Sequence, residues 1–368
     1  MEIRRRQTRQ VRIGEVAVGG GAPISVQTMA KTHTRDVAPT LAQIEICADL
    51  GCRLVRVAVP TAEDAKALRE IVPRSPLPVI ADIHFDHRLA LAALEAGVQG
   101  LRLNPGNLRG RDKIERIARE AAARAVPIRV GVNVGSLPPE LRRRIKAGEV
   151  TVPEAMATAA LDEIRLLEDV GFTQIKVSLK ASDVPTTIEA YRLLAPRCDC
   201  PFHVGVTEAG PALRGTVKSA LGIGVLLLEG LVDTLRVSLT ADPAEEVIVG
   251  RLILQAAGLL PDAPDLVSCP TCGRLEVDLR PVAAEVDRFI QTLKVPIKVA
   301  VMGCSVNGPG EAREADVGLA AGKGFALIFR RGEIVRRVPE AEMLDALKEE
   351  ILKEVGTGTR DAGGRKRG

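Results

Sequence analysis

Residues 54–84 read LVRVAVPTAEDAKALREIVPRSPLPVIADIH, and this stretch contains the repeating unit of the chain. Its first apolar run is followed by a segment with helical periodicity, Thr61–Ile71, and then by a second apolar run that begins at Pro78. Thr61 has Asp64 at the offset of a capping box, which marks the start of a helix. The stretch therefore predicts a strand, a helix and a strand.

The same alternation continues on both sides of this unit. Short runs rich in Val, Ile and Leu begin at Ile24, Leu54, Pro78, Gly100, Pro127, Gln174, Phe202 and Thr234. Segments with helical periodicity separate them, including 40–50, 88–96, 112–125, 153–170, 184–194 and 243–257. Eight strand–helix units over about 235 residues favour a closed (β/α)8 TIM-type barrel. A doubly wound open sheet is the alternative, but no GxGxxG follows the first strand.

The regular alternation of strand and helix ends after the eighth unit. We expect a barrel domain over 1–258, a Pro/Asp linker over 259–265, a small α+β domain over 266–355 and a disordered basic tail over 356–368. Within the small domain, strands are expected at 266–270, 296–303, 315–319 and 325–330, and helices near 282–293 and 339–355.

Composition excludes several classes of protein. The net charge is +4, and the last 13 residues carry four basic residues and one acidic residue, so the body is almost neutral. With Trp 0, Tyr 1 and Phe 6, the chain has few aromatic rings on which bases could stack, which argues against a nucleic-acid partner. No apolar run reaches the roughly 18 residues of a membrane span, and no signal peptide follows the basic N-terminus. We expect a cytoplasmic protein, whose seven cysteines stay free of structural disulfides.

Basic residues interrupt five strands that should be apolar on both faces. They are Arg56, Arg102, Arg129, Lys176 and Arg236, and small polar residues follow four of them: Asn104, Asn133, Ser178 and Ser238. Because strand residues two apart share a face, several strands would present a cation beside a hydrogen-bonding group. Such a set predicts a site for a phosphate-rich small molecule at the C-terminal ends of the strands. The alternative is that acids such as Asp82 and Glu208 pair with these cations.

Other polar residues lie near the strand ends. Asp82, His84, His203 and Glu208 could serve acid–base or hydroxyl-binding roles, or could be hydrogen-bonded structural residues.

Three cysteines distinguish the small domain. Cys269 and Cys272 form a CxxC after a strand, and Cys304 follows in MGCSVNGPGE. Three thiolates with a Gly- and Asn-rich loop suit an iron–sulfur cluster with one iron that lacks a cysteine, and Glu311 is the nearest acidic residue for it. A structural zinc site, a redox disulfide and chance remain alternatives.

These motifs resemble a known family. CPTCGR at 269–274, VMGCSVNGPGE at 301–311, NVGSL at 133–137 and HVGVTEAG at 203–210 are similar to the 4-hydroxy-3-methylbut-2-enyl diphosphate synthases of the non-mevalonate isoprenoid pathway, in their short bacterial form. The resemblance covers residues 1 to about 355 and departs at no motif position.

The resemblance implies an iron–sulfur oxidoreductase of isoprene biosynthesis. Its reaction would be the reductive dehydration and ring opening of 2-C-methyl-D-erythritol 2,4-cyclodiphosphate, with electrons from flavodoxin or ferredoxin passing through a [4Fe-4S] cluster. The family's cluster ligands fall on Cys269, Cys272, Cys304 and Glu311. Its diphosphate-binding positions fall on Arg102, Arg129, Asn133, Lys176, Arg236 and Ser238, to which Asn104, Ser178 and His203 are added from the strand pattern. Arg56 and Asn307 would lie near the reacting oxygen, and Glu311 would leave the unique iron and assist proton delivery.

The linker also bears on assembly. About eight residues follow the eighth helix and reach at most ~28 Å. Spanning back to the chain's own barrel mouth would use nearly all of that reach, so we expect a head-to-tail homodimer, as the resemblance also implies. Two other classes remain open: a phosphate-binding lyase or pterin-type transferase with a zinc domain, and a redox sensor or cluster carrier.

Overall fold

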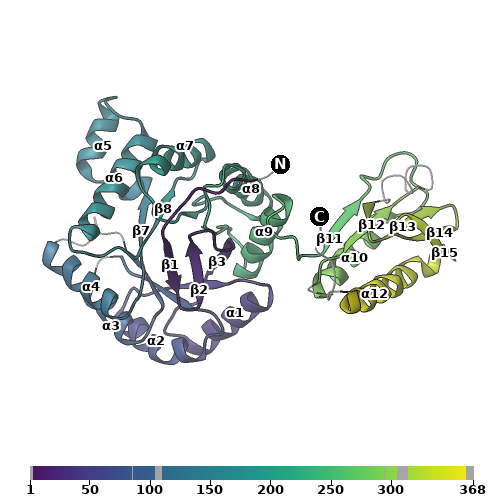
Figure 1. Cartoon of the computed structure of the whole chain (residues 1–368), viewed down its shortest axis with the longest axis horizontal. Coiled ribbons are helices and arrows are strands. Elements are labelled where there is room, and N and C mark those ends of the chain that lie inside the picture. Colours follow the sequence, from purple (N-terminus) through teal and green to yellow (C-terminus); the bar gives the residue numbers. More distant parts are fainter. Residues whose placement is uncertain (1–2, 85, 104–109, 294, 305–313, 362–368) are drawn as a thin grey trace. The chain divides into compact units, whose positions relative to one another are not determined.

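The structure, a computed structural model, describes residues 3–84, 86–103, 110–293, 295–304 and 314–361 (Figure 1). The chain divides into two compact units, Met1–Leu259 and Leu260–Gly368, and each is described by itself.

Eight parallel strands form the barrel of the first unit. They are β3 (Ser25–Met29), β4 (Leu54–Ala58), β5 (Val79–Asp82), β6 (Gly100–Leu103), β7 (Ile128–Asn133), β8 (Ile175–Lys180), β9 (His203–Val204) and β10 (Thr234–Leu235). Their order is β8-β7-β6-β5-β4-β3-β10-β9. The two end strands meet again, because Val177 of β8 bridges Phe202 and donates its N–H to the Pro201 carbonyl oxygen over 2.9 Å. The expected barrel is therefore confirmed, and the open-sheet alternative is wrong.

Helices follow the strands and surround the barrel (Figure 1). They are α1 (Val37–Asp49), α2 (Ala62–Arg74), α3 (His87–Glu95), α4 (Arg111–Ala123), α6 (Val152–Glu168), α7 (Val184–Leu194), α8 (Ala212–Leu228) and α9 (Pro243–Ala256), with a short α5 (Pro139–Lys146) before α6. In α2, Thr61 accepts a hydrogen bond from the Asp64 N–H, as the capping box predicts. Helical periodicity does not predict α8, because apolar residues occupy its outer face as well as its inner face.

An N-terminal hairpin covers the base of the barrel. Strands β1 (Gln10–Ile13) and β2 (Val16–Gly19) pair antiparallel, and their buried side chains pack with Leu54 and Ile80 near the N-terminal ends of β4 and β5. This hairpin is not predicted from the sequence. Since the hairpin covers the base, ligands reach the barrel interior from the opposite end, where the C-terminal ends of the strands lie.

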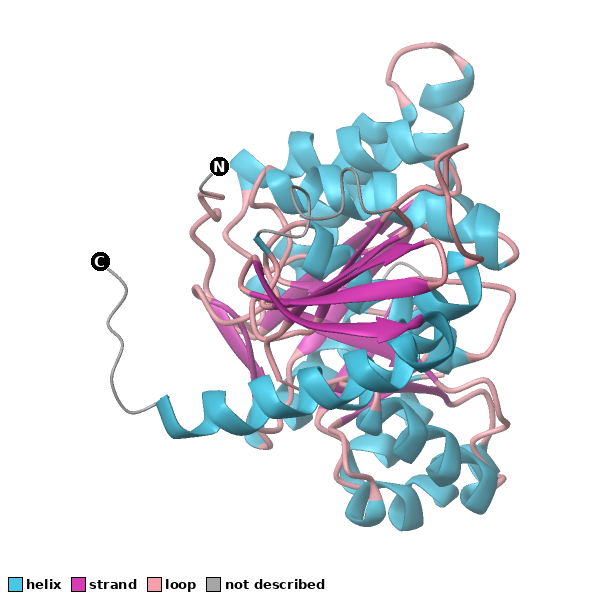
Figure 2. Cartoon of the chain, turned by 90° about the vertical axis from the view of Figure 1, so that its right-hand side faces the viewer, coloured by secondary structure: helices cyan, strands magenta, loops and turns pink. Residues whose placement is uncertain are grey.

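The described part of the second unit contains a five-stranded sheet and the helices that pack on it. Its strands, in spatial and chain order, are β11 (Asp265–Ser268), β12 (Lys298–Met302), β13 (Val317–Gly322), β14 (Phe325–Arg330) and β15 (Glu333–Pro339), and its helices are α10 (Leu279–Leu293) and α12 (Met343–Asp361). β11 and β12 are parallel, as are β12 and β13, and the last two pairings are antiparallel. Figure 2 shows α12 lying across the strands, and Leu347 and Ile351 join the apolar core there.

Two differences from expectation concern this unit. β15 is not predicted, because most of its residues are exposed and the alternation of buried and polar positions is lost. α12 continues to Asp361, past the start of the expected tail at 356, and residues 362–368 lie outside the described chain. In the parts described, no helix is both long enough and apolar enough to cross a membrane.

Candidate functional site

Four charged side chains lie in one layer across four neighbouring barrel strands. Asp82 of β5 pairs in register with Arg102 of β6, Arg102 with Arg129 of β7, and Arg129 with Lys176 of β8. Residues paired between parallel strands point to the same face of a sheet. All four are at most 5% exposed, so the sheet register places three cations and one carboxylate side by side in a buried layer.

Two further guanidinium groups lie near this layer, that of Arg56 on β4 and that of Arg236 directly after β10. Arg56 Nη1 lies 3.6 Å from Asp82 Oδ2, and Arg236 Nη2 lies 3.3 Å from Glu246 Oε2 of α9. The Met29 sulfur lies 2.9 Å from Arg56 Nη2 and 3.6 Å from Arg236 Nη1. The two guanidinium groups therefore flank one side chain and pair with different carboxylates; Asp82 also pairs with Arg102, and Glu246 also pairs with Lys31.

Lys180 is a sixth cation of the barrel interior, and it is buried. It follows Lys176 and Ser178 at intervals of two along β8, so all three share a face. Its Nζ lies 3.4 Å from His203 Nε2, and His203 Nδ1 lies 2.8 Å from Thr234 Oγ1. Lys180 is not among the predicted site residues, although the alternation in QIKVSLK places it on the same face as Lys176 and Ser178.

Two glycines leave room for these side chains. A Cβ on Gly131 would lie 2.8 Å from Arg102 Nε. A Cβ on Gly205 would lie 2.3 Å from the Arg236 carbonyl oxygen and 3.0 Å from Lys180 Nζ. A larger residue at either position would displace a cation, so the glycines belong to the site.

Positive charge exceeds negative charge in this interior. Six cations of the described chain lie in this interior, Arg56, Arg102, Arg129, Lys176, Lys180 and Arg236, and three of them form ion pairs: Arg56 and Arg102 with Asp82, and Arg236 with Glu246. Several buried donors have no hydrogen-bond partner among the residues that the structure describes, namely Nε of Arg56 and Arg102, Nε and Nη1 of Arg129, and Nζ of Lys176. Buried donors are normally satisfied, and leaving a charged one unpaired is costly. An anion with several oxygens would supply the missing acceptors.

The buried cations have lowered pKa values because they lie close to one another and away from water. Burial, followed by repulsion from neighbouring cations, lowers the pKa of Arg129, Lys176 and Lys180 well below the ordinary values. Burial also lowers the pKa of Arg56 to about 10, against the attraction of Asp82. Burying these charges together is unfavourable, and a bound anion would offset that cost.

Two other groups near the cations have shifted pKa values. Burial by itself raises the pKa of Asp82, but Arg56, His84 and Arg102 together hold that pKa well below its usual range. Burial and Lys180 lower the pKa of His203. A neutral His203 that donates from Nδ1 to Thr234 leaves Nε2 free to accept from the ammonium group of Lys180.

The smaller polar residues expected beside the cations are placed as follows. Asn133 ends β7 opposite Lys180 in register, and its backbone N–H donates to Ser136 Oγ over 3.1 Å. Ser178 is buried on β8 between Lys176 and Lys180, and Ser238 is half-buried beyond β10. Asn104, Asn307 and Glu311 lie outside the described residues.

The alternative in which acids neutralise the cations holds only in part. Asp82 pairs with Arg56 and Arg102. Glu208 is exposed, with a backbone φ of 51°, and in the described structure none of the six cations pairs with it. Glu246 was not anticipated, because an acid in the first turn of a helix ordinarily signals helix capping rather than burial.

The cysteines of the second unit lie at the ends of two adjacent strands. Cys269 directly follows β11, and Cys304 follows β12 by two residues; these strands are parallel neighbours. A Cβ on Gly303 would lie 3.4 Å from Cys269 Sγ, so the backbone beside Cys304 comes close to that thiol. Cys272 is exposed, and hydrogen bonds from the backbone and side chain of Arg274 lower the pKa of its thiol. Within the described ranges, no three His, Cys, Asp or Glu side chains gather into a metal site.

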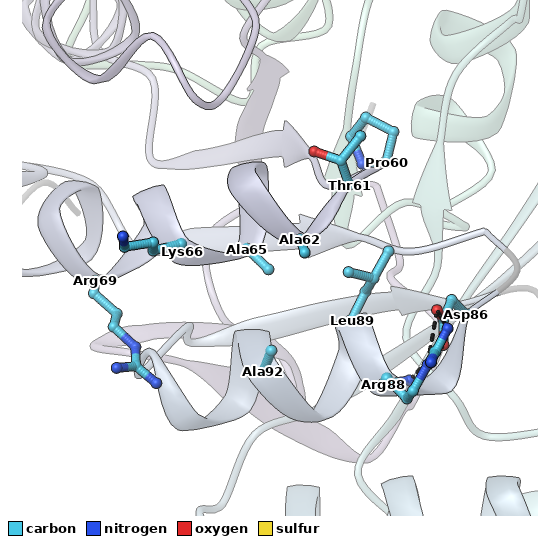
Figure 3. A pocket seen from close by; sticks show the side chains of 10 residues that line it. All are labelled: Pro60, Thr61, Ala62, Ala65, Lys66, Arg69, Asp86, Arg88, Leu89 and Ala92. Atoms are coloured by element: carbon cyan, nitrogen blue, oxygen red, sulfur yellow. Dashed lines mark hydrogen bonds and ion pairs between the residues drawn. The ribbon is translucent and has the colours of Figure 1, made fainter.

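The outer surface of the barrel has a groove. It lies between α2 and α3, with Ala65 and Ala92 on its walls and Lys66, Arg69 and Arg88 around it (Figure 3). Arg88 pairs with Asp86 at 2.7 Å. The groove contains none of the unpartnered buried donors found inside the barrel, so the barrel interior is the stronger candidate.

Comparison with known proteins decides the family. The profile of the GcpE TIM-barrel domain matches residues 8–251, and that of the GcpE protein C-terminal domain matches residues 265–353. The chain belongs to the GcpE family. The family expected from the sequence motifs is thereby confirmed, together with its TIM barrel and C-terminal domain.

Similar GcpE proteins cover nearly the whole chain. A protein of Geobacter sulfurreducens is 57% identical over 94% of this chain and 98% of its own length. One of Dehalococcoides mccartyi is 52% identical over 95% and 99%, and one of Geobacillus thermodenitrificans is 52% identical over 95% and 93%. All three are named 4-hydroxy-3-methylbut-2-en-1-yl diphosphate synthase (flavodoxin). These names confirm the expectation of an oxidoreductase.

Proposed function

We propose that this protein converts 2-C-methyl-D-erythritol 2,4-cyclodiphosphate to (E)-4-hydroxy-3-methylbut-2-enyl diphosphate. The reaction consumes two electrons and two protons, breaks the ring C–O bond to phosphate and releases one water. The observation that carries the proposal is the buried layer of cations with unpartnered donors, which suits a diphosphate. Membership of the GcpE family supports the identity of the product.

The barrel residues bind and orient the diphosphate. Arg102, Arg129 and Lys176 form one layer from which unpartnered N–H groups can donate to phosphate oxygens. Binding an anion there raises the pKa values of the buried cations and keeps them charged. Further donors to the diphosphate are expected at Asn104, Asn133, Ser178, His203, Arg236 and Ser238.

Arg56 is expected to act near the leaving oxygen of the substrate. Its guanidinium lies at the edge of the cation layer, where Asp82 orients it and one donor is unpartnered. Asn307 and Glu311 are assigned to the same part of the reaction, and Glu311 would carry a proton to the oxygen that departs as water. These last two roles rest on the family motif alone.

Cys269, Cys272, Cys304 and Glu311 would hold a [4Fe-4S] cluster. The thiols fit this group chemically, since iron–sulfur clusters favour thiolates, and Gly303 allows close approach to Cys269. When bound, the cluster supplies the two electrons, which come from flavodoxin or ferredoxin. The names of the relatives favour flavodoxin as the donor.

We also infer a head-to-tail homodimer, in which the cluster domain of one copy serves the barrel of the other. Eight residues, 257–264, separate α9 from β11, and they extend to at most ~28 Å. That length supports reaching a neighbouring barrel more readily than returning along the chain's own barrel to its mouth.

The test begins with protein purified without oxygen and analysed for iron, sulfide and zinc. About four irons and four sulfides per chain, with turnover of the cyclodiphosphate by reduced flavodoxin, are expected. One zinc without sulfide, or a loaded protein with no turnover, would contradict the proposal. Glu311→Ala should keep the colour of the cluster and lose most of the turnover. Near-normal turnover would remove Glu311 from the mechanism while leaving the reaction in place.

A further inference from the structure

Two cysteines of the barrel have no part in the proposed reaction. Cys198 and Cys200 are separated by one residue in the sequence RCDCP, which directly precedes β9. This loop therefore lies at the N-terminal ends of the strands, at the base of the barrel, whereas a ligand enters from the opposite end. Any chemistry of these two thiols is separate from the binding of a ligand at the barrel mouth.

The two thiol groups lie within hydrogen-bonding distance of each other. Cys198 has extended backbone angles, with φ −150° and ψ 161°, and residues two apart in an extended segment point to the same side. Cys198 is half-buried, whereas Cys200 is buried. A reagent from solution can therefore meet the first sulfur, and the second sulfur lies within reach of the first.

Two arginines of the N-terminal segment hold this loop in place. Arg6 Nη1 donates to the Cys198 carbonyl oxygen over 2.6 Å, and Arg6 Nη2 donates to the Cys200 carbonyl oxygen over 2.5 Å. Between them, the Arg9 N–H donates to the Asp199 carbonyl oxygen over 2.8 Å, and the Arg9 guanidinium pairs with the Asp199 carboxylate. Because the backbone of all three loop residues is fixed, the two thiols stay together in the folded protein.

The surroundings of the pair activate Cys198 and not Cys200. The hydrogen bond with the Cys200 thiol, helped by the nearby charge of Arg6 and opposed by burial, lowers the pKa of Cys198 to about 7. The same contact, together with burial, raises the pKa of Cys200. The thiolate, and not the thiol, is the nucleophile in thiol–disulfide exchange. At neutral pH, Cys198 is therefore the thiol of this pair that attacks first.

A second pair of barrel cysteines, Cys47 and Cys52, shows the ordinary behaviour of buried thiols. Both residues are at most 2% exposed. Burial raises the pKa of Cys47 to about 12 and that of Cys52 to about 11. The Cys52 thiol also donates to the carbonyl oxygens of Val26 and Leu54. We expect these two thiols to be inert toward reagents in solution, which makes them an internal control.

We propose that Cys198 and Cys200 form a reversible thiol–disulfide site that reacts with low-molecular-weight disulfides. The Cys198 thiolate attacks one sulfur of the reagent, releases one thiolate and becomes a mixed disulfide. The charge that keeps Cys200 protonated is then gone, so Cys200 loses its proton, attacks the Cys198 sulfur and releases the second thiol of the reagent. Two protein thiols are oxidised to one disulfide while the disulfide of the reagent is reduced to two thiols, and an excess of the reduced reagent reverses the exchange.

The test treats the full chain, loaded with its cluster, with oxidised glutathione at neutral pH and without oxygen. Trypsin cleaves after Lys and Arg, so peptide 198–214 contains Cys198 and Cys200 as its only cysteines, and peptide 36–53 contains Cys47 and Cys52 as its only cysteines. Mass spectrometry after alkylation of the free thiols therefore follows each pair separately from the cysteines of the second unit. Peptide 198–214 should acquire an internal disulfide on the order of a hundredfold faster than peptide 36–53, and reduced glutathione should remove it.

Two variants separate the roles of the two thiols. Cys200→Ser should stop at the mixed disulfide, with one glutathione attached to Cys198, whereas Cys198→Ser should leave Cys200 unreactive because Cys200 is buried. An unreactive Cys198, equal rates for the two peptides, or a glutathione that stays on Cys198 in the unchanged protein would overturn the proposal. The comparison of peptides in the unchanged protein decides the matter even where a variant fails to fold.

Discussion

The two units bury opposite kinds of side chain in the middle of their sheets. β7 and β8 of the barrel carry Arg129, Lys176 and Lys180, which are nearly inaccessible to solvent. β12 and β13 of the second unit carry Val299 and Leu319 at fully buried positions. Apolar burial stabilises a fold, whereas burying unpaired cations costs stability. The proposed diphosphate site would account for the buried charges of the barrel, whereas the buried apolar side chains of the small sheet contribute to folding.

The largest expected effect comes from removing one of the unpartnered cations. Arg129→Met should weaken pyrophosphate binding by about a hundredfold to a thousandfold, because two charge-assisted hydrogen bonds are lost. The free energy of unfolding of the ligand-free protein should stay the same or rise by about 1–3 kcal/mol, since a desolvated charge disappears. Calorimetric titration measures the affinity for pyrophosphate, and denaturant unfolding measures the free energy of unfolding. If Arg129→Met lowered the free energy of unfolding by more than 2 kcal/mol, Arg129 would stabilise the fold as the buried apolar side chains of the second unit do, and the contrast between the units would be wrong.

The opposite outcome is expected for the carboxylate of the same layer. Asp82→Asn should lower the free energy of unfolding by about 3–5 kcal/mol, because Arg56 and Arg102 lose their counter-charge. Asp86→Asn is a suitable control, since its pair with Arg88 is at the surface and worth less than about 1 kcal/mol. Equal effects of the two substitutions would argue against the buried cluster.

Substitutions in the core of the second unit should change the free energy of unfolding and leave the affinity for pyrophosphate unchanged. Leu347→Ala removes a fully buried side chain of α12 and should lower the free energy of unfolding by about 3 kcal/mol. Leu352→Ala, exposed on the same helix, should change it by less than about 0.5 kcal/mol. Pyrophosphate affinity should be the same in both variants, as a titration would check.

The smallest effect concerns pH. The lowered pKa of Lys176 in the folded barrel means that the unfolded chain binds more protons, so the ligand-free protein gains stability as the pH rises. The gain continues toward the unfolded pKa of about 10.4, by at most about 1.4 kcal/mol per pH unit for each such group. Denaturant unfolding between pH 7 and pH 9 should show this slope. Lys176→Met should reduce the slope, and saturating pyrophosphate should abolish it; an unchanged slope in both would refute the assignment.

Much of the barrel and part of the site are readable from the sequence. The Val-, Ile- and Leu-rich runs predict the barrel strands, since burial on both faces leaves a continuous apolar pattern. Arg102, Arg129 and Lys176 are found because a charge inside such a run is conspicuous. The register that aligns them is not readable, because it depends on how neighbouring strands pair.

The features that were missed share a physical cause. Glu246 contacts Arg236 across the space between a strand end and the following helix, and no short-range pattern encodes such a contact. The hairpin β1–β2 is short, and its burial depends on packing against Leu54 and Ile80. α8 has no amphipathic pattern because apolar residues occupy its exposed positions as well as its buried ones.

The alignment of Asp82, Arg102, Arg129 and Lys176 has a kinetic consequence. Each residue comes from a different strand, so the complete layer exists only after four consecutive strand–helix units have docked. Partly folded chains hold no such layer, and a diphosphate has little to bind during the rate-limiting step of folding. The ligand should therefore leave the refolding rate nearly unchanged and act almost entirely by slowing the unfolding of the finished barrel.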